Sequence, residues 1–212
     1  SEKLKAQIRG TKQAERNAND GISMIQTAEG GLNEVSSILT RLRELSIQSA
    51  SDTVGDPERS FTNLEYQNLK QEIERISQVT DFNGKKLLNG TGDKFDFQIG
   101  IHNDDFQDRI KYDAAMSNSS LESLAIHELD VSNKEGAQTS LAGLDMAIEK
   151  VSGQRAALGA VQNRLTSTIQ NLQVSGENLS TANSRIRDTD FADETAKNVK
   201  LNILTNAGTS VL

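Results

Sequence analysis

The chain has 212 residues, no cysteine, 30 acidic against 23 basic residues and a net charge of −7. The missing cysteines exclude disulfides, thiolate nucleophiles and Cys-ligated metals, and the acidic balance argues against a nucleic-acid binder, which needs a basic face. No apolar run is long enough to span a bilayer, so we expect no membrane insertion.

The first predicted element is a long helix over about residues 1–52. Its early part shows steps of four and three, carried by Leu4, Ile8, Thr11, Glu15, Ala18, Ile22 and Ile25. Beyond Gly30 and Gly31 a clearer stripe follows, made of Leu32, Val35, Leu39 and Leu42. The two stripes differ in register by one residue, which predicts either a slight bend or change of partner at the glycines, or simple tolerance of a glycine pair.

A second helix is predicted over about residues 57–80. Asp56 suits the N-cap, Pro57 the first helical position and Glu58 the positive helix end. Its core positions are Leu69, Ile73 and Ile76. Because the connection is short, we expect these two helices to lie antiparallel.

The residues over about 85–131 predict a small β-hairpin region. A turn signal at Asp81-Phe82-Asn83-Gly84 precedes it, and a second at Asn89-Gly90-Thr91-Gly92 lies near its start. The hydrophobic period then becomes two, with one face carrying Phe95, Phe97, Ile99, Ile101, Ile110, Tyr112 and Ala114. We expect residues 116–131 to be irregular.

A third, very long helix is predicted over about residues 134–187, opened by a capping box of Ser132 and Glu135. Its heptad series has apolar residues at Leu141, Leu144, Ile148, Val151, Leu158, Leu165, Ile169, Leu172, Leu179 and Ile186, with Arg155, Gln162, Gly176 and Asn183 in the same series. Such a helix would be roughly 80 Å long.

Asp188-Thr189-Asp190 is expected to break that helix, and a short helix over about residues 190–206 follows, with Phe191, Val199 and Ile203 on one face. The whole pattern predicts a mainly α fold in a single domain, residues 1–212. Its shape would be an elongated rod of two antiparallel N-terminal helices and one long C-terminal helix, with the β-hairpin region between them.

No catalytic residue, metal site or cofactor is predicted. Neither His102 nor His127 has a glutamate three residues before it, and no HExxH, phosphate loop or G-x-S-x-G motif occurs. Asp104 and Asp105 could pair for acid–base chemistry, but they fall on an expected exposed turn with nothing to desolvate them. No leader is apparent, since Ser1 opens directly into a polar helical pattern.

Six blocks of sequence resemble bacterial flagellin and occur in that family's order: Asn17-Ala-Asn-Asp-Gly-Ile22, Arg41-Leu-Arg-Glu-Leu45, Phe82-Asn-Gly84, Leu158-Gly-Ala-Val-Gln-Asn-Arg164, Ser184-Arg-Ile-Arg-Asp-Thr-Asp190 and Ala207-Gly-Thr-Ser210. The resemblance implies a structural subunit of the extracellular flagellar filament, secreted through the hollow growing filament and self-assembling for swimming motility. The implied partners are other flagellin subunits, a flagellar export chaperone, the cap protein and a Toll-like innate-immune receptor. It also implies that further terminal segments are missing here at both ends and that the middle of the chain is short.

The spacing of residues on the first helix also indicates a candidate surface. Ile38, Arg41, Leu45 and Gln48 lie one residue off the core stripe of the first helix, so they should be partly exposed at the edge of the helix pair. Arg41 and Glu65 should fall at the same height on adjacent antiparallel helices. Spacing alone leaves a solvated face with an ordinary ion pair as the simpler interpretation. The resemblance implies instead a protein-binding patch for subunit contact and for the receptor, containing Arg41, Leu45, Gln48 and Glu65.

Two alternatives remain at this point. The hook–filament junction protein of the same superfamily shares the terminal helices, although its resemblance to these blocks is looser. A secreted coiled-coil effector would carry heptads but would have no reason to carry all six blocks.

Overall fold

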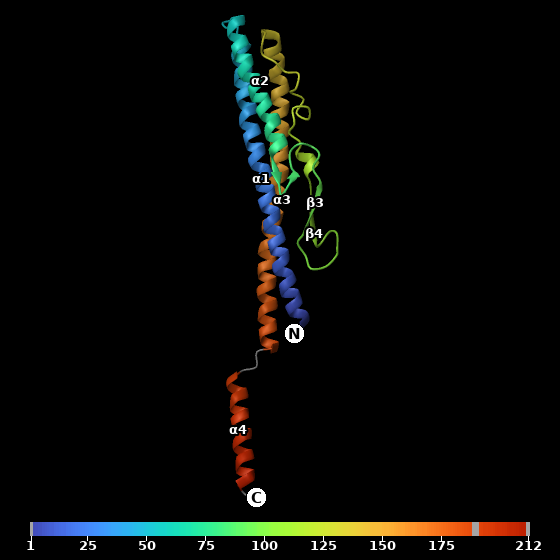
Figure 1. Cartoon of the computed structure of the whole chain (residues 1–212), viewed down its shortest axis with the longest axis vertical. Helices are drawn as coiled ribbons and strands as arrows, with labels where there is room; N and C mark the ends of the chain where they lie inside the picture. Colours follow the sequence, from blue (N-terminus) through green and yellow to red (C-terminus); the bar gives the residue numbers. More distant parts are fainter. Residues whose placement is uncertain (1, 188–190, 211–212) are drawn as a thin grey trace.

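A computed structural model describes residues 2–187 and 191–210, and only the backbone at 186–187, 191–193 and 207–210. Its elements in chain order are α1 (Glu2–Ser49), α2 (Asp56–Val79), β1 (Asp81–Phe82), β2 (Lys85–Lys86), β3 (Lys94–Gln98), β4 (Arg109–Asp113), the 3₁₀ turn η1 (Ala114–Ser117), α3 (Lys134–Arg187) and α4 (Phe191–Ser210). Figure 1 shows α1 and α3 side by side along a slender shaft, with α2 against its upper part and the β3–β4 region beside its middle. The predicted mainly α, elongated fold is confirmed.

The buried side of α1 is one unbroken seam. Apart from Met24 and Leu45 beside it, the buried positions follow alternating steps of three and four: Thr11, Ala14, Ala18, Gly21, Ile25, Ala28, Leu32, Val35, Leu39, Leu42, Ser46 and Ser49. The predicted register shift is therefore wrong, because Ala14 and Gly21 occupy the seam where Glu15 and Ile22 were expected. A Cβ on Gly21 would lie 3.0 Å from the Phe97 ring, so a small residue is what lets the β region approach.

The two adjacent glycines have different surroundings. A Cβ on Gly30 would meet nothing within 4 Å, whereas one on Gly31 would lie 2.7 Å from Leu88 and 2.9 Å from the Thr80 hydroxyl. Gly31 thus makes room for the chain that follows α2, and the pair marks no change in the seam.

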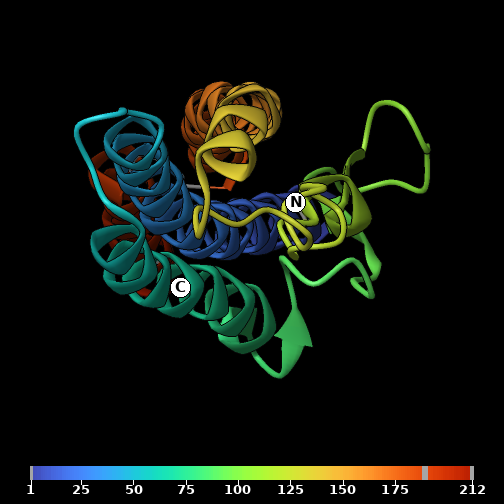
Figure 2. The ribbon, with the colours of Figure 1, turned by 90° about the horizontal axis from the view of Figure 1, so that it is seen from above.

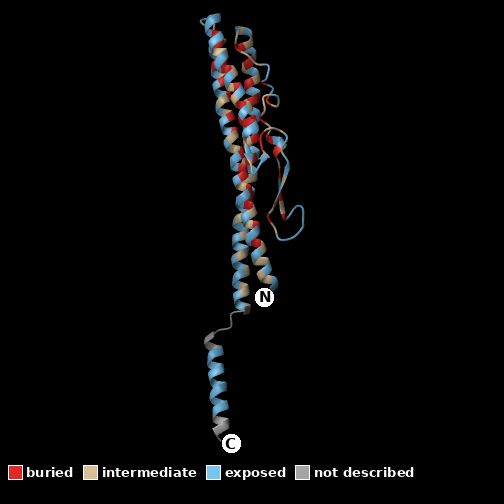
Figure 3. Ribbon diagram, in the orientation of Figure 1, coloured by how far each residue is buried: buried red, intermediate tan, exposed pale blue. Residues whose placement is uncertain are grey.

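The α3 seam confirms four positions of the predicted heptad series. Leu144, Val151, Leu158 and Leu165 are buried as expected, but the positions that alternate with them are Ser140, Ala147 and Gln154 rather than Leu141, Ile148 and Arg155. Small or hydrogen-bonded side chains fit these positions. Ser140 Oγ donates to the Asp130 carbonyl at 3.0 Å, and Gln154 Nε2 donates to the Asn118 carbonyl at 2.9 Å. Between residues 166 and 185 no α3 side chain is buried, so this stretch of the shaft is largely open to water (Figure 3).

The start of α2 differs from the prediction. Gly55 is the N-cap and Asp56 lies inside the helix, so Asp56 caps nothing and instead pairs with Arg59 at 2.9 Å. Arg59 is 7% exposed, and its guanidinium donates to the carbonyls of Ser49 at 2.8 Å and Ser51 at 2.9 Å. One side chain therefore fastens the α1–α2 turn by satisfying carbonyls at the end of α1.

The core face of α2 contains polar residues that the periodicity did not indicate. Ile73 and Ile76 are buried as predicted, Leu69 is only half-buried, and Tyr66 and Lys70 are buried as well. Seen along the shaft, α2 and α3 lie on different sides of α1, as Figure 2 shows.

The β-hairpin is confirmed, with β3 and β4 antiparallel and Phe97 opposite Ile110. Ile99, Ile110, Tyr112 and Ala114 are buried. The expectation for Ile101 is wrong, since it is 39% exposed; β3 ends at Gln98, and the alternation does not extend beyond Ile99. A second small hairpin, β1–β2, was not predicted. Its turn residues Asn83 and Gly84 have φ of 51° and 78°, as a type I′ turn requires.

Residues 118–131 form an irregular segment along the upper shaft, as expected after η1. Leu124, Ile126 and Val131 are its buried anchors. The Lys70 ammonium donates to the carbonyls of His127 at 2.6 Å and Leu129 at 2.7 Å.

The predicted capping box at the start of α3 is wrong. Asn133 is the cap, because its Oδ1 accepts from the Gly136 amide at 2.7 Å. Ser132 instead donates to the Asp130 carboxylate.

The last helix, α4, lies beyond the lower end of α3 in Figure 1. It runs to Ser210, past the predicted end at residue 206, and its described side chains from 194 to 206 are all exposed, Val199 and Ile203 among them. The predicted break at 188–190 and the side chain of Phe191 lie outside the described residues. Among the helices described, none combines the length and apolarity needed to cross a membrane.

Candidate partner-binding surface

Arg41 on α1 and Glu65 on α2 lie at the same height, as predicted. Arg41 Nε and Glu65 Oε1 are 2.9 Å apart, and Arg41 Nη1 reaches Glu44 Oε2 at 3.0 Å. The pair forms because the short turn before α2 brings the two helices together in antiparallel order. One guanidinium therefore bridges carboxylates from both helices on the outer face of the upper shaft.

Leu45 does not lie on this face. It is 2% exposed, so the prediction of partial exposure is wrong for this residue. The physical reason is that α2 closes the edge of α1 on which Leu45 lies. Gln48 is exposed. We call the exposed set Arg41, Glu44, Gln48 and Glu65 the Arg41 patch.

The Arg41 patch is charged and open to water. Hydrogen bonds to Glu44 and then Glu65 raise the pKa of Arg41, so the guanidinium stays ionised. The side chains of Arg41 and Glu65 are 48% and 47% exposed. A surface pair of this kind adds little to stability, and its groups remain available to a partner.

Two apolar side chains beside the patch were missed from the sequence. Phe61 is 72% exposed and Leu64 is 63% exposed, and Phe61 lies one helical turn before Glu65. A signal was available, since Phe61 and Leu64 are large apolar residues on the face of α2 that does not carry the core positions. Exposed apolar residues rimmed by charges are typical of interfaces.

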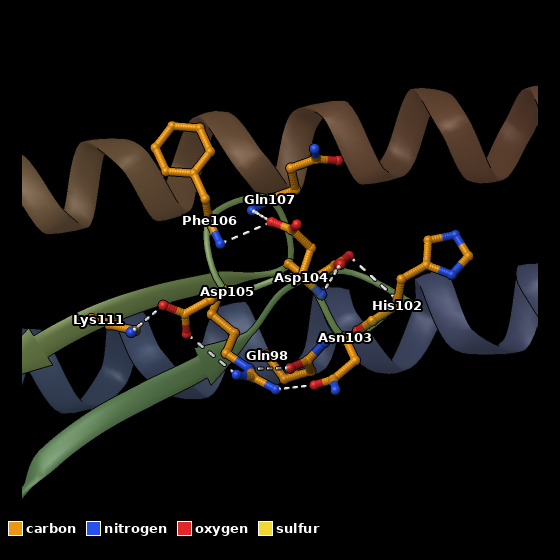
Figure 4. Close-up of polar contacts among 10 residues, drawn as sticks. Gln98, His102, Asn103, Asp104, Asp105, Phe106, Gln107 and Lys111 are labelled. Carbon is orange, nitrogen blue, oxygen red and sulfur yellow. Dashed lines mark hydrogen bonds and ion pairs between the residues drawn. The ribbon is translucent and has the colours of Figure 1, made fainter.

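The loop between β3 and β4 carries the acidic residues considered for catalysis, and they shape the loop itself (Figure 4). Asp104 Oδ1 accepts from the amides of Phe106 at 2.9 Å and Gln107 at 2.7 Å. Asp105 pairs with Lys111 at 2.5 Å, and this hydrogen bond is the first cause that lowers the pKa of Asp105. A carboxyl held ionised and exposed is unsuited to act as a general acid. Within residues 2–187 and 191–210, no cluster of His, Asp and Glu suits a metal ion.

Family comparisons place both helical arms in one family. Residues 1–93 match the bacterial flagellin N-terminal helical region, and residues 141–212 match the bacterial flagellin C-terminal helical region. The chain is 44% identical over its whole length to a flagellin of Halalkalibacterium halodurans, of which it covers 77%. It is 41% identical to a flagellin of Bacillus subtilis, again over the whole chain and 79% of that protein.

A solved structure agrees with this assignment. The crystal structure of Bacillus cereus flagellin superposes with a TM-score of 0.66 at 31% identity, covering 74% of this chain and 88% of that one. Flagellins are structural proteins rather than enzymes, and the filament that they build lies outside the cell. These matches favour flagellin over the hook–filament junction protein and over a coiled-coil effector. The chain belongs to the bacterial flagellin family and is a subunit of the flagellar filament.

Proposed function

We propose that this subunit is secreted and self-assembles by helix packing into a helical homopolymer that drives swimming. The observation that carries this proposal is the state of α4. Its large apolar side chains Val199, Leu201, Ile203 and Leu204 are 56%, 62%, 62% and 60% exposed. A lone helix of 20 residues with so much apolar surface in water is marginal, so it needs a partner.

The partner proposed for α4 is the same helix region of other subunits. Ala196, Val199 and Ile203 follow steps of three and four, so they form one stripe that a neighbouring helix can cover. Burying these side chains between subunits would supply the favourable free energy of assembly.

The experiment places the full-length gene in a motile bacterium from which its own flagellin genes are deleted. Wild-type protein should give filaments by electron microscopy and swimming in soft agar. Ile203→Asp should abolish filaments, because a carboxylate cannot be buried in an apolar contact. Asn198→Asp, which lies off the Ala196–Val199–Ile203 stripe, adds the same charge and should leave filaments intact. Absence of filaments from the wild type, or normal filaments from Ile203→Asp, would contradict the proposal.

We also propose that the Arg41 patch binds the Toll-like innate-immune receptor. The support is an exposed guanidinium presented between two carboxylates beside Phe61 and Leu64, a composition that suits recognition. Arg41→Ala should weaken receptor signalling at matched protein concentration. The control is Arg75→Ala, which removes an exposed arginine on α2 that is paired with Glu72 and lies outside the Arg41 patch. Equal signalling by wild type and Arg41→Ala would refute the proposal; Leu45→Ala is not a clean test because Leu45 is buried.

Family membership supports two further proposed partners, a flagellar export chaperone and the cap protein.

We further propose that residues 1–212 act as a single rod domain. Support comes from the shared seam of α1 and α3, which joins opposite ends of the sequence. Thermal unfolding followed by circular dichroism and by differential scanning calorimetry should then show one cooperative transition for the shaft. Two separated transitions would contradict the proposal of a single domain.

A further inference from the structure

Four basic residues form a row on the lower part of α1. Lys5, Arg9, Lys12 and Arg16 are spaced by four, three and four residues, so they share one face of the helix. This face lies opposite the buried seam, and Arg9, Lys12 and Arg16 are exposed. We call these four residues the basic row.

Most of the charge in the basic row is not neutralised within the chain. Lys5 lies 3.5 Å from Glu2, and the Arg16 guanidinium donates to the neutral side chain of Gln13. Arg9 and Lys12 make no ion pair with any of the residues that the structure describes. An uncompensated row is notable in a chain whose net charge is −7.

An acidic row runs along the upper shaft. Glu58, Glu65 and Glu72 are spaced by seven residues on α2, so they lie on one face, and Glu44 of α1 joins them through Arg41. Two exposed arginines, Arg41 and Arg75, pair with members of this acidic row. Four carboxylates against two guanidinium groups leave the row negative, and Glu58 has no ion pair in the described part of the chain.

The two rows match in length but cannot meet within one molecule. The basic row spans 11 residues and the acidic row 14, which correspond to roughly 16 and 21 Å along their helices. The basic row is near the N-terminal end of α1 in Figure 1, whereas the acidic row lies beside its upper end. Their centres, near residues 10 and 41 of α1, are separated by roughly 45 Å of helix.

We infer that the basic row of one subunit docks on the acidic row of a second copy displaced along the shaft by about that distance. This inference rests on the proposed self-assembly and adds the register of the contact and its chemistry. Complementary charges raise the rate of encounter and disfavour wrong registers, because misplaced rows bring like charges together. The contact therefore fixes the axial register between two neighbouring subunits.

The test measures the elongation rate of filaments from full-length monomers by light scattering, seeded with fragments of wild-type filament. Arg9→Glu/Lys12→Glu should slow elongation at least tenfold, and so should Glu58→Lys/Glu65→Lys. The control Lys85→Glu/Lys94→Glu removes the same charge from the β region, where both lysines are exposed, and should elongate at the wild-type rate. Circular dichroism checks that every variant is folded. We expect this because the substituted residues are exposed.

The decisive variant carries both reversals in one chain. Its rows are again complementary to each other, so self-seeded elongation should return to within about threefold of the wild-type rate. Raising NaCl from 20 to 200 mM should slow the wild type and the combined variant alike, because salt screens exposed charges.

Three results would overturn the inference. The first is a wild-type elongation rate for the variant with only the basic row reversed or only the acidic row reversed. The second is a combined variant whose elongation rate does not recover. The third is a basic row that binds anionic polymers although its reversal leaves the elongation rate unchanged. In each case wild-type filaments still form, so self-assembly stands. Failure of the proposed function would show itself differently, as a wild-type protein that forms no filaments.

Discussion

The upper shaft and α4 are both helical, yet their apolar side chains have opposite environments. Leu144, Val151 and Leu158 of α3 are 0% exposed, whereas Leu201 and Ile203 of α4 are each 62% exposed. Figure 3 shows the contrast as buried residues along the upper shaft and exposed ones along the described part of α4. The difference does not come from helix formation, which both sequences support. It comes from where the covering helix is: within the chain for α3, and on another subunit, in our proposal, for α4.

The largest expected effect is on the buried side of this comparison. Leu158→Ala should lower the free energy of unfolding of the monomer by about 2–5 kcal/mol, because it leaves a cavity between α1 and α3. Ile203→Ala removes an apolar side chain that has no cover in the monomer and should leave that free energy unchanged. Urea denaturation followed by circular dichroism measures both. Equal destabilisation by the two substitutions would show that α4 packs within the subunit.

A smaller loss is expected from the α1–α2 turn. Arg59→Ala should cost about 1–3 kcal/mol, since the carbonyls of Ser49 and Ser51 lose their charged donor in a buried site. The matched control is Arg75→Ala, whose side chain is 59% exposed and which should leave the urea midpoint in place. If both variants behave like the wild type, Arg59 does not fasten the turn.

The two adjacent glycines of α1 should respond differently to substitution by alanine. Gly30→Ala should stabilise the shaft by about 0.5–1 kcal/mol, because alanine is the better helix former and the space is open. Gly31→Ala gains the same helix propensity but pushes on Leu88 and Thr80, so it should be less stable than Gly30→Ala. Thermal unfolding of the two variants side by side decides this. An identical gain for both would mean that the chain after α2 is not packed on Gly31.

The smallest effect concerns pH. Burial raises the pKa of Tyr66 above its ordinary value of 10.0. An unfolded tyrosine therefore ionises first, so the contribution of Tyr66 to stability is fully present below pH 10 and is lost as the pH rises above it. Burial lowers the pKa of Lys70, so the contribution of Lys70 to stability changes with pH in the opposite direction. Lys70 is present both in the wild type and in the Tyr66→Phe variant that tests this effect.

Tyr66→Phe should accordingly show a shallower loss of stability between pH 10 and 11 than the wild type. Urea midpoints at pH 8, 10 and 11 measure the slopes. Parallel slopes for the two proteins would mean that the Tyr66 hydroxyl titrates as it does in the unfolded chain.

The apolar pattern predicted the elements well because each long helix buries one stripe. Leu144, Val151, Leu158 and Leu165 were found in this way. The pattern failed where the seam uses small or polar residues. Gly21 and Ser140 are buried because another segment approaches closely or a backbone carbonyl is at hand, and neither condition can be read from hydrophobicity.

The candidate surface shows the same division. The pairing of Arg41 with Glu65 followed from counting residues back from the turn, so the sequence was sufficient. Leu45 could not be placed in that way, because its burial depends on how far α2 leans over α1. Asn133 capped α3 in place of Ser132 for a related reason: the capping-box motif was present, but Asp130 engages the Ser132 hydroxyl.

Hydrogen exchange of the full-length protein, as monomer and as filament, tests the central claim most directly. Our account predicts that the amides of α1 and α3 around Leu39 and Leu158 are protected in both states, whereas those of α4 around Ile203 exchange rapidly in the monomer and become protected only in the filament. Strong protection of α4 in the monomer, or continued rapid exchange of α4 in the filament, would contradict the claim that its partner is another subunit.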